Sequence, residues 1–494
     1  MNYNKILKRP IVLCLLSAIL LSCPWWGWSG WFSLVGWTPM LFLRERLVQD
    51  GRKGFWGWSA LTISLWYLFT TYWVSFATPI ASPAIIITGL GMTLPAWWLF
   101  HYVSKRSTRT LAYTVLISGW IVIEWWNGLG DISFPWILLG SAWADNTMVV
   151  QWYSIFGQSG GTLWVMLCNV LAFEVIRTKF SRNRVVWFSA MVLVPVALSL
   201  VLYNLHKEST QRVEVAIIQP NVDAYKKFSS GTAWDQTRSI LELAQSAPTD
   251  TKLFVAPETA LVSSVNLPMI ESNRDVAAIQ DFLRDVSPEG LFIIGASTRD
   301  KAAHYNSVLY ISKDSVKVYH KRKLVLAVEI VPEWVSPFAN ALDMGGYVGS
   351  LGRSSEAMVV GGVGAVVCYE SIYSEHFAEW VSQGAQLMAI ITNDGWWRDT
   401  YGYRQHFDFA RLRAVESGRW IVRSANTGIS GIIDSRGDVI DSLGWDKRGV
   451  VSGSVELRSG VTFYTVWGDI VTRLSVYVLC LSLLYFVSMR YRKQ

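Results

Sequence analysis

The sequence predicts a multi-pass α-helical membrane bundle of about eight spans, joined to one α/β domain that lies outside the cytoplasm. Three observations predict this architecture. First, 51% of the 494 residues are hydrophobic and only 16% are charged, which is typical of membrane proteins. Second, the apolar residues crowd into 10–204 and 466–489, whereas the middle of the chain has an ordinary globular composition. Third, the Lys and Arg residues that flank the apolar stretches lie in alternate loops.

Eight apolar stretches approach the roughly 20 residues that a helix needs to cross a bilayer. They cover 10–26, 30–43, 55–77, 84–104, 111–127, 158–176, 185–204 and 468–489. The second stretch is short enough to be re-entrant. The first also resembles a lipoprotein signal peptide that ends at Cys23, although Pro24 directly after it argues against cleavage.

Basic residues give these stretches an orientation. Clusters of Lys and Arg fall at 5–9, 44–53, 105–109, 177–184 and 490–493, whereas the alternate loops 24–29, 78–83 and 128–148 contain none. Because positive loops stay in the cytoplasm, we expect both termini there. The domains are then a transmembrane bundle over 1–204, an outer domain over 205–467, and a final transmembrane helix with a cytoplasmic tail over 468–494. The net charge of +7 mostly reflects the cytoplasmic loops, so it does not indicate nucleic-acid binding.

The segment 205–467 reads as one α/β domain. Short apolar, β-branched runs recur along it, and such runs suit strands that are covered on both faces. They lie at 213–219, 253–257, 291–297, 307–312, 365–369, 387–392, 420–425 and 431–435. Helical patterns at 234–245, 275–286 and 404–418 separate several of these runs. We therefore expect buried sheets whose strands end at functional loops.

Three of the strand ends carry unusual polar residues, namely Glu258, Lys321 and Cys368. A thiolate is a nucleophile, a carboxylate can accept its proton, and an ammonium can stabilise the oxyanion of a tetrahedral intermediate. Together they form a usable set for acyl transfer. Cys368 is also the one cysteine in the polar part of the chain. The others lie in or beside long apolar stretches: Cys14, Cys23, Cys168 and Cys480.

Each of these residues also has an ordinary structural interpretation. A lone cysteine in an α/β sheet is usually inert core. Glu258 follows a proline at a strand end, which is equally typical of a solvated loop or a helix cap. Lys321 lies in the basic run 320–323, which suits a face near phospholipid head groups. Strand alternation puts Lys321 and Lys323 on one face, so the pattern does not show which lysine would be functional. Composition alone therefore does not decide between the functional and the structural interpretation.

Three tripeptides in this part of the chain resemble the nitrilase (carbon–nitrogen hydrolase) superfamily. They are Pro-Glu-Thr at 257–259, Tyr-His-Lys at 319–321 and Cys-Tyr-Glu at 368–370, in that order. The resemblance implies an αββα sandwich and maps the superfamily's Glu–Lys–Cys triad onto Glu258, Lys321 and Cys368. Together with the predicted spans, it narrows to the apolipoprotein N-acyltransferase family. Further similar segments lie at 134–136, 219–221, 305–307, 393–397, 405–406 and 426–428.

The resemblance also implies supporting or substrate-binding residues. Glu329 stands where the family has a further functional glutamate. Glu370 is a second candidate for orienting the lysine or the nucleophile, although both glutamates also suit ordinary supporting structure. The backbone N–H of Tyr369 is expected to face the developing oxyanion, and Asn306 lies in the Tyr-Asn-Ser turn.

The chain departs from the family pattern in two loops. Residues 326–328 lack the Pro and Gly that the family commonly has there, which changes the backbone preferences of that loop. Lys227-Phe228 stands where the family tends toward Lys-Trp, at the position of a substrate contact. The loop 326–356, which is rich in Gly and Ser, is expected to form a lid.

By this resemblance we expect a ping-pong acyltransferase of the bacterial inner membrane, with its catalytic domain on the periplasmic side. Cys368 takes an acyl chain from a phospholipid as a thioester, and the α-amine of an apolipoprotein's diacylglyceryl-cysteine then accepts it. Two alternatives remain open: a membrane-tethered nitrilase-like amidase or hydrolase, and a non-catalytic lipid-binding or transport protein that retains the fold.

Further expectations concern partners and cofactors. We expect a monomer that binds no nucleic acid. No metal or other cofactor is expected either, because the six histidines show no HExxH or Cys-His ligand spacing. A Cys–His pair with His376 is disfavoured, since no Asn or Asp partner for that histidine is identifiable.

Overall fold

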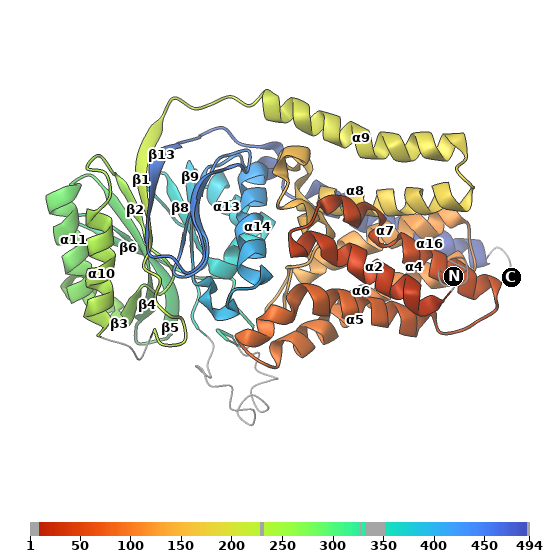
Figure 1. Cartoon of the computed structure of the whole chain (residues 1–494), viewed down its shortest axis with the longest axis horizontal. Coiled ribbons are helices and arrows are strands. Elements are labelled where there is room, and N and C mark those ends of the chain that lie inside the picture. Colours follow the sequence, from red (N-terminus) through yellow and green to blue (C-terminus); the bar gives the residue numbers. More distant parts are fainter. Residues whose placement is uncertain (1–8, 228–231, 327, 331–350, 492–494) are drawn as a thin grey trace. The chain divides into compact units, whose positions relative to one another are not determined.

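The computed structural model describes residues 9–227, 232–326, 328–330 and 351–491 of a chain that forms two compact units (Figure 1). The helical unit combines Met1–Asn204 with Trp467–Gln494. The sheet unit is Leu205–Val466 and contains both β-sheets.

The helical unit consists of α-helices joined by loops that include 3-10 turns. Their bounds are α2 (Pro10–Ser22), α3 (Ser33–Gly36), α4 (Thr38–Gln49), α5 (Phe55–Thr71), α6 (Ala81–Ser104), α7 (Arg109–Asn127), α8 (Tyr153–Arg177), α9 (Arg182–Asn204) and α16 (Ile470–Tyr491). Among the described residues, four of these helices are long and apolar enough to cross a membrane, namely α6, α8, α9 and α16. Helices α2 and α5 have 13 and 17 residues. The count of eight spans therefore stays a prediction.

The second predicted stretch, 30–43, is broken between α3 and α4. Pro39 lies in the first turn of α4, where a missing N–H costs nothing. The side chain of Asn169 accepts hydrogen bonds from the backbone N–H groups of Trp37 (2.6 Å) and Thr38 (3.1 Å). These bonds satisfy the polar backbone that the break leaves inside the bundle.

Two sheets form the centre of the sheet unit. The strand order is β13-β1-β2-β4-β5-β6 in the first, where β3 also pairs with β4, and β12-β11-β10-β9-β8-β7 in the second. The bounds are β1 (Arg212–Gln219), β2 (Leu253–Val255), β3 (Leu261–Asn266), β4 (Leu291–Arg299), β5 (His304–Ile311), β6 (Val316–His320), β7 (Val359–Val360), β8 (Val363–Val367), β9 (Leu387–Thr392), β10 (Ile421–Ala425), β11 (Ser430–Ile433), β12 (Val439–Leu443) and β13 (Gly449–Glu456). In the first sheet β2 and β4 run parallel, and two antiparallel steps through β5 give β6 the same direction. The carboxyl ends of β2 and β6 therefore reach one edge.

Helices cover the outer faces of both sheets (Figure 1). On the first, α10 (Ala233–Gln245) and α11 (Arg274–Val286) bury Ile240, Val276 and Ile279 in one core with Phe254 and Phe292. On the second lie α13 (Ser374–Ser382) and α14 (Tyr401–Ser417). The sheets face each other through β1 with β10 and β5 with β8. These four layers confirm the predicted αββα sandwich.

Candidate active site

Cys368 stands at a sharp turn between a buried strand and a short helix. Every residue of β8 is buried, and a 3-10 turn begins at Cys368 itself. Its φ of +50° lies in the left-handed region, which is uncommon for a residue with a side chain and recurs at functional sites. The backbone oxygen of Cys368 accepts a hydrogen bond from the Ser371 hydroxyl (2.7 Å) and lies 3.1 Å from Nε2 of His406. These contacts hold the strained turn, and Cys368 as a whole residue is 8% exposed.

Glu258 lies just beyond the end of β2, on a loop that packs tightly against β4. The backbone continues the strand pairing, because Gly295 N–H donates to Pro257 O at 3.1 Å. Thr259 takes a φ of +48°, so the chain turns sharply after Glu258. Gly295 permits this approach, since a Cβ there would lie 2.6 Å from the Cα of Glu258 and 2.5 Å from the backbone nitrogen of Thr259. The carboxylate of Glu258 is thereby fixed at the sheet edge.

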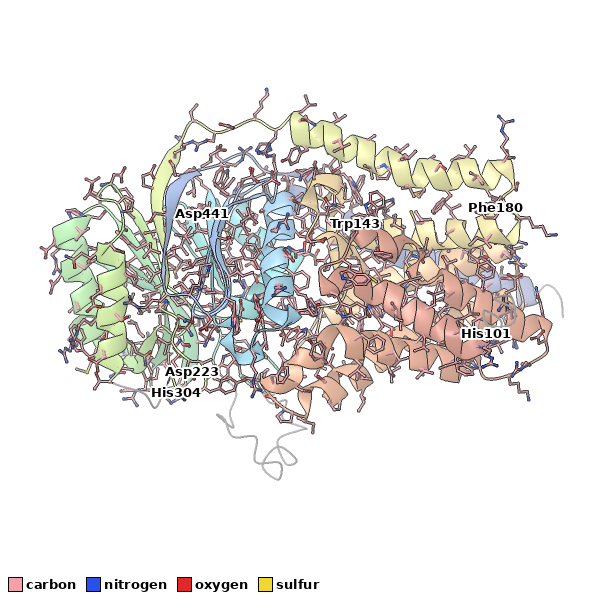
Figure 2. All side chains as sticks on the ribbon, viewed as in Figure 1. His101, Trp143, Phe180, Asp223, His304 and Asp441 are labelled. Atoms are coloured by element: carbon pink, nitrogen blue, oxygen red, sulfur yellow. The ribbon has the colours of Figure 1, made fainter. Side chains whose placement is uncertain are left out.

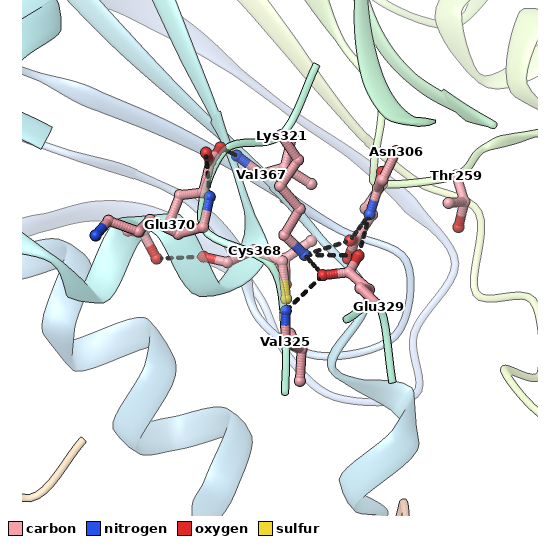
Figure 3. A network of polar contacts seen from close by, with 12 residues as sticks. Thr259, Asn306, Lys321, Val325, Glu329, Val367, Cys368 and Glu370 are labelled. Atoms are coloured by element: carbon pink, nitrogen blue, oxygen red, sulfur yellow. Dashed lines mark hydrogen bonds and ion pairs between the residues drawn. The ribbon is translucent and has the colours of Figure 1, made fainter. Parts of the chain in front are cut away.

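Lys321 follows β6 and joins two carboxylates at that same edge (Figure 3). Its Nζ lies 3.3 Å from Oε1 of Glu258 and 2.9 Å from Oε2 of Glu329. Asn306 on β5 donates from Nδ2 to Oε1 of both carboxylates at 2.7 Å. The side chain of Lys321 is 1% exposed. A buried ammonium that is held by two carboxylates and a shared amide has a fixed position, as a preorganised charge requires.

The charges of this cluster also act on the thiol. Burial raises the pKa of Cys368 well above its ordinary value, and the Glu258 carboxylate raises it further. The ammonium of Lys321 opposes that rise without outweighing it. Burial alone lowers the pKa of Lys321, but the carboxylates of Glu329 and Glu258 raise it above its ordinary value. The resting site therefore combines a protonated thiol with a permanent ammonium.

Glu370 fixes the backbone on both sides of the cluster. Its Oε1 accepts hydrogen bonds from the Tyr319 hydroxyl (2.6 Å) and the Arg322 N–H (2.7 Å), and its Oε2 accepts from the Val367 N–H (2.8 Å). Although burial raises its pKa, the contact with His376 and these hydrogen bonds bring the pKa below its usual value. Glu370 is thus a buried carboxylate that joins the end of β6 to the end of β8. His376, at 3.1 Å from its Oε1, is part of that support.

A second buried network lies under Cys368. Asp394 is 2.8 Å from Nδ1 of His406 and 2.8 Å from Nη2 of Arg423, and it accepts a 2.9 Å hydrogen bond from Thr392. Asp394 and Thr392 stand at the end of β9, beside β8. In the sequence, 393–397 and 405–406 stand out only as segments similar to the family, with no predicted role of their own. The same rule that found Cys368, a polar residue after a buried strand, applies to Asp394.

Lys227 also belongs to the site, although its residue type and position in the sequence did not predict that it would support the Glu258 loop. Its Nζ donates to the backbone oxygen of Glu258 and to the Thr259 hydroxyl, both at 3.0 Å. It is buried, and that burial lowers its pKa to about 8. No periodic pattern points to a lysine in this place, because the preceding residues 220–227 form no strand or helix. Lys227 is therefore a positioning residue for the Glu258 loop.

The remaining predicted features of the site are the backbone N–H of Tyr369 and the loop 326–356. Tyr369 is buried and its ring lies 5.4 Å from that of Tyr373, whereas the orientation of its N–H toward a substrate oxygen stays a prediction. The expected lid at 326–356 falls mostly outside the described residues, which omit 327 and 331–350.

Comparisons with known proteins agree with this architecture. The family model for carbon-nitrogen hydrolases matches residues 214–461, and the model for the apolipoprotein N-acyltransferase N-terminal domain matches residues 17–171. Apolipoprotein N-acyltransferase from Chlorobaculum tepidum is 28% identical, over 95% of this chain and 95% of that protein. The proteins of the same name from Thermotoga maritima and Vibrio vulnificus are each 26% identical, over 92% and 94% of this chain and 88% and 94% of their own lengths. The chain therefore belongs to the carbon-nitrogen hydrolase family, in the branch that carries the apolipoprotein N-acyltransferase N-terminal domain.

Proposed function

We propose that this protein transfers a fatty acyl chain from a phospholipid to the α-amine of the N-terminal diacylglyceryl-cysteine of apolipoproteins, through a thioester on Cys368. One observation carries the proposal. A carboxylate, an ammonium and a thiol stand at three strand ends, and the charges of Glu258 and Lys321 both act on the pKa of Cys368. Relatives that bear the name of this activity match nearly the whole chain.

The first half-reaction forms the acyl-enzyme. Because the Cys368 thiol is protonated at rest, it needs a base at the moment of attack, and Glu258 takes that proton. The sulfur adds to the ester carbonyl of the phospholipid. Lys321 and the N–H of Tyr369 stabilise the oxyanion. The C–O bond then breaks, Glu258 returns the proton to the leaving oxygen, and a lysophospholipid departs.

The second half-reaction uses the same groups in reverse. The amine of the lipoprotein attacks the thioester and loses a proton to Glu258. The C–S bond breaks, the proton passes to the sulfur, and an amide is released. Because an amide is more stable than a thioester, the free energy change of this step favours transfer to the amine. Asn306, Glu329 and Glu370 touch no substrate in this scheme; they hold the lysine and the strand ends in place.

We propose the following membrane arrangement for this chemistry. Both substrates carry acyl chains that are costly to expose to water, so a site at the outer leaflet can receive them from the bilayer. The alternation of basic loops supports eight spans, cytoplasmic termini, a periplasmic sheet unit and an inner-membrane location. Reporter fusions after residues 50, 107, 180 and 494 test this topology, and each is expected to report the cytoplasm. The protein is proposed to act as a monomer.

The test of the activity is an acylation experiment on the purified full chain. Incubation with phospholipid labelled in its acyl chain is expected to label Cys368 through a bond that hydroxylamine cleaves. Addition of a diacylglyceryl lipopeptide is expected to move the label to the peptide amine. Label released as free fatty acid instead assigns a hydrolase, and the absence of any label assigns a non-catalytic lipid-binding protein. Either result overturns the proposal.

A matched cysteine variant separates a specific acyl-enzyme from chance acylation. Cys480 on α16 is an exposed free thiol. Cys480→Ser is therefore expected to keep the label, and Cys368→Ser to lose the hydroxylamine-labile label together with all transfer. Equal labelling of both variants contradicts the assignment of Cys368 as the nucleophile.

A further inference from the structure

A basic pocket lies inside the helical unit, among α4, α6, α7 and α8. Its volume is about 330 Å³, and its polar lining includes Arg44, Glu45, Lys105 and Arg109. The lining comes from α4, from the end of α6 with the following Lys105, from the start of α7, and from Phe173 of α8. His101, one turn before Lys105, marks this end of the unit in Figure 2, where Phe180 of the turn after α8 also lies. This is the end at which the basic loops gather.

The charges in the pocket do not balance. Arg109 is paired, since its guanidinium lies 2.6 Å from Glu45 and 3.7 Å from Glu174. Within the described part of the chain, neither Arg44 nor Lys105 forms an ion pair. The pocket therefore keeps an excess of positive charge, which favours an anionic group.

Arg44 adds a second, independent observation. Its Nε is buried and has no hydrogen-bond partner among the described residues, while Nη2 donates to the hydroxyl of Ser104. The ring centre of Phe100 lies 5.5 Å from the Arg44 guanidinium carbon, within the range of a cation–π contact. A buried donor without a partner is unfavourable, and an oxyanion in the pocket would satisfy it.

Glu45 offers the complementary group. Its Oε2 is buried and also lacks a hydrogen-bond partner among the described residues. A ligand that satisfies both atoms carries an oxyanion for Arg44 and a hydrogen-bond donor for Glu45. Apolar side chains complete the wall, among them Leu41, Val48 and Phe173. The pocket thus combines an anion site, an acceptor and an apolar surface.

We propose that this pocket binds one phospholipid through its phosphate group, and that it prefers head groups with a hydrogen-bond donor. The phosphate contacts Arg44 and Lys105, and the amine of ethanolamine or the hydroxyl of glycerol donates to Glu45. An acyl chain lies against the apolar wall. A choline head group has no donor and leaves Glu45 unsatisfied. The bound lipid belongs to the leaflet on the side of the basic loops, so it is not a substrate of Cys368 in the proposed topology.

Native mass spectrometry of the delipidated full chain in neutral detergent tests the proposal. The protein is titrated with phosphatidylethanolamine, phosphatidylglycerol and phosphatidylcholine. We expect one tight site for the first two lipids, and an affinity at least about fivefold lower for phosphatidylcholine because it lacks the donor. Equal affinity for all three lipids overturns the donor preference, and the absence of a tight site overturns the proposal.

Variants distinguish the pocket from general attraction to a basic surface. The R44Q/K105Q variant is expected to bind at least about tenfold more weakly than the unchanged protein. The control R182Q/R184Q removes two exposed positive charges at the start of α9 and is expected to bind normally. Equal weakening in both variants contradicts a defined site. If R44Q/K105Q does not fold, the single change K105Q on the exposed Lys105 is expected to weaken binding about fivefold, and no weakening overturns the proposal.

A soluble competitor separates lipid binding from simple phosphate binding. Inorganic phosphate and glycerophosphate are expected to displace the lipid only at concentrations far above that of the lipid itself, because they lack the acyl contact with Leu41 and Val48. Displacement at equal concentration shows that the pocket takes a free phosphate, which overturns the lipid assignment.

Discussion

Gly295 is the residue whose substitution tests the geometry of the site most directly. A Cβ at position 295 would lie 2.5 Å from Thr259 N and 2.6 Å from both Glu258 Cα and Pro257 O, whereas ordinary contact begins at 3.4 Å. All three neighbours are backbone atoms, so no side chain can rotate away. Gly295 itself is paired with Val308 on β5 and cannot retreat freely. The Glu258 loop must therefore move by about 0.9 Å to bring Thr259 N to ordinary contact.

The expected effect of Gly295→Ala follows from that displacement. Overpacking of this kind costs about 1–3 kcal/mol of stability. A misplacement of about 1 Å in a catalytic group costs on the order of 100-fold in rate. We therefore expect the rate of Cys368 labelling from acyl-labelled phospholipid to fall about 100-fold, while the thermal unfolding transition falls by only several degrees. The labelling rate at saturating lipid is the decisive measurement, because a displaced base slows chemistry at full occupancy.

Gly444→Ala is the matched control for this change. Gly444 also lies in the sheet unit, and an added Cβ there meets nothing within 4 Å. We expect this variant to label at the unchanged rate. The reasoning is refuted if Gly295→Ala labels within about threefold of the unchanged protein, or if Gly444→Ala is impaired to the same degree.

Three further predictions concern the charges around the thiol. Because the pKa of Cys368 is raised, its alkylation by iodoacetamide is expected to be slow at pH 7 and to increase about tenfold per pH unit to beyond pH 9. Glu258→Gln removes a negative neighbour and is expected to shift this profile to lower pH, measured by peptide mass spectrometry; an unchanged profile contradicts the assignment. Asn306→Leu removes the amide that joins two carboxylates, so we expect labelling to slow about 10–100-fold, and full activity contradicts its bridging role. Lys321→Met is expected to slow labelling about 100–1000-fold and to destabilise the fold by about 3–5 kcal/mol, whereas Lys317→Met, an exposed change on the strand β6 that precedes Lys321, alters neither. Equal effects of the two lysine changes refute a special charge at Lys321.

The sequence predicted the buried strands of both sheets and the strand that ends before Lys321, but not β12 and β13 at the sheet margins. Runs such as 253–257 and 387–392 are continuous and apolar, and they form β2 and β9. By contrast, β12 (Val439–Leu443) is largely exposed and β13 (Gly449–Glu456) is only partly buried, so neither gives a continuous apolar signal. The helix predicted over 404–418 begins earlier, at Tyr401, because the Thr400 side chain accepts a hydrogen bond from Gly402 N–H at its start.

Local sequence pattern predicted only those residues of the candidate site that follow directly after a strand. Alternation did not separate Lys321 from Lys323, because β6 ends at His320 and the two-residue period no longer applies beyond it. The structure buries Lys321 and places Lys323 over the ring of Tyr373, 4.7 Å from its centre. Gly295 and Lys227 act through the loop of Glu258. Their positions depend on which strands become neighbours, and a single sequence does not encode that in any local pattern.

The protonated state of Cys368 also affects how readily the thiol is oxidised. Oxidants and disulfides react with thiolates, and the proposed periplasmic site faces a compartment that drives disulfide formation. A buried sulfur with a raised pKa offers them little thiolate between turnovers. Burial makes a base necessary for each acyl transfer. The same burial therefore protects the Cys368 thiol, while no lipid is bound, from oxidation to a sulfenic acid and from formation of mixed disulfides.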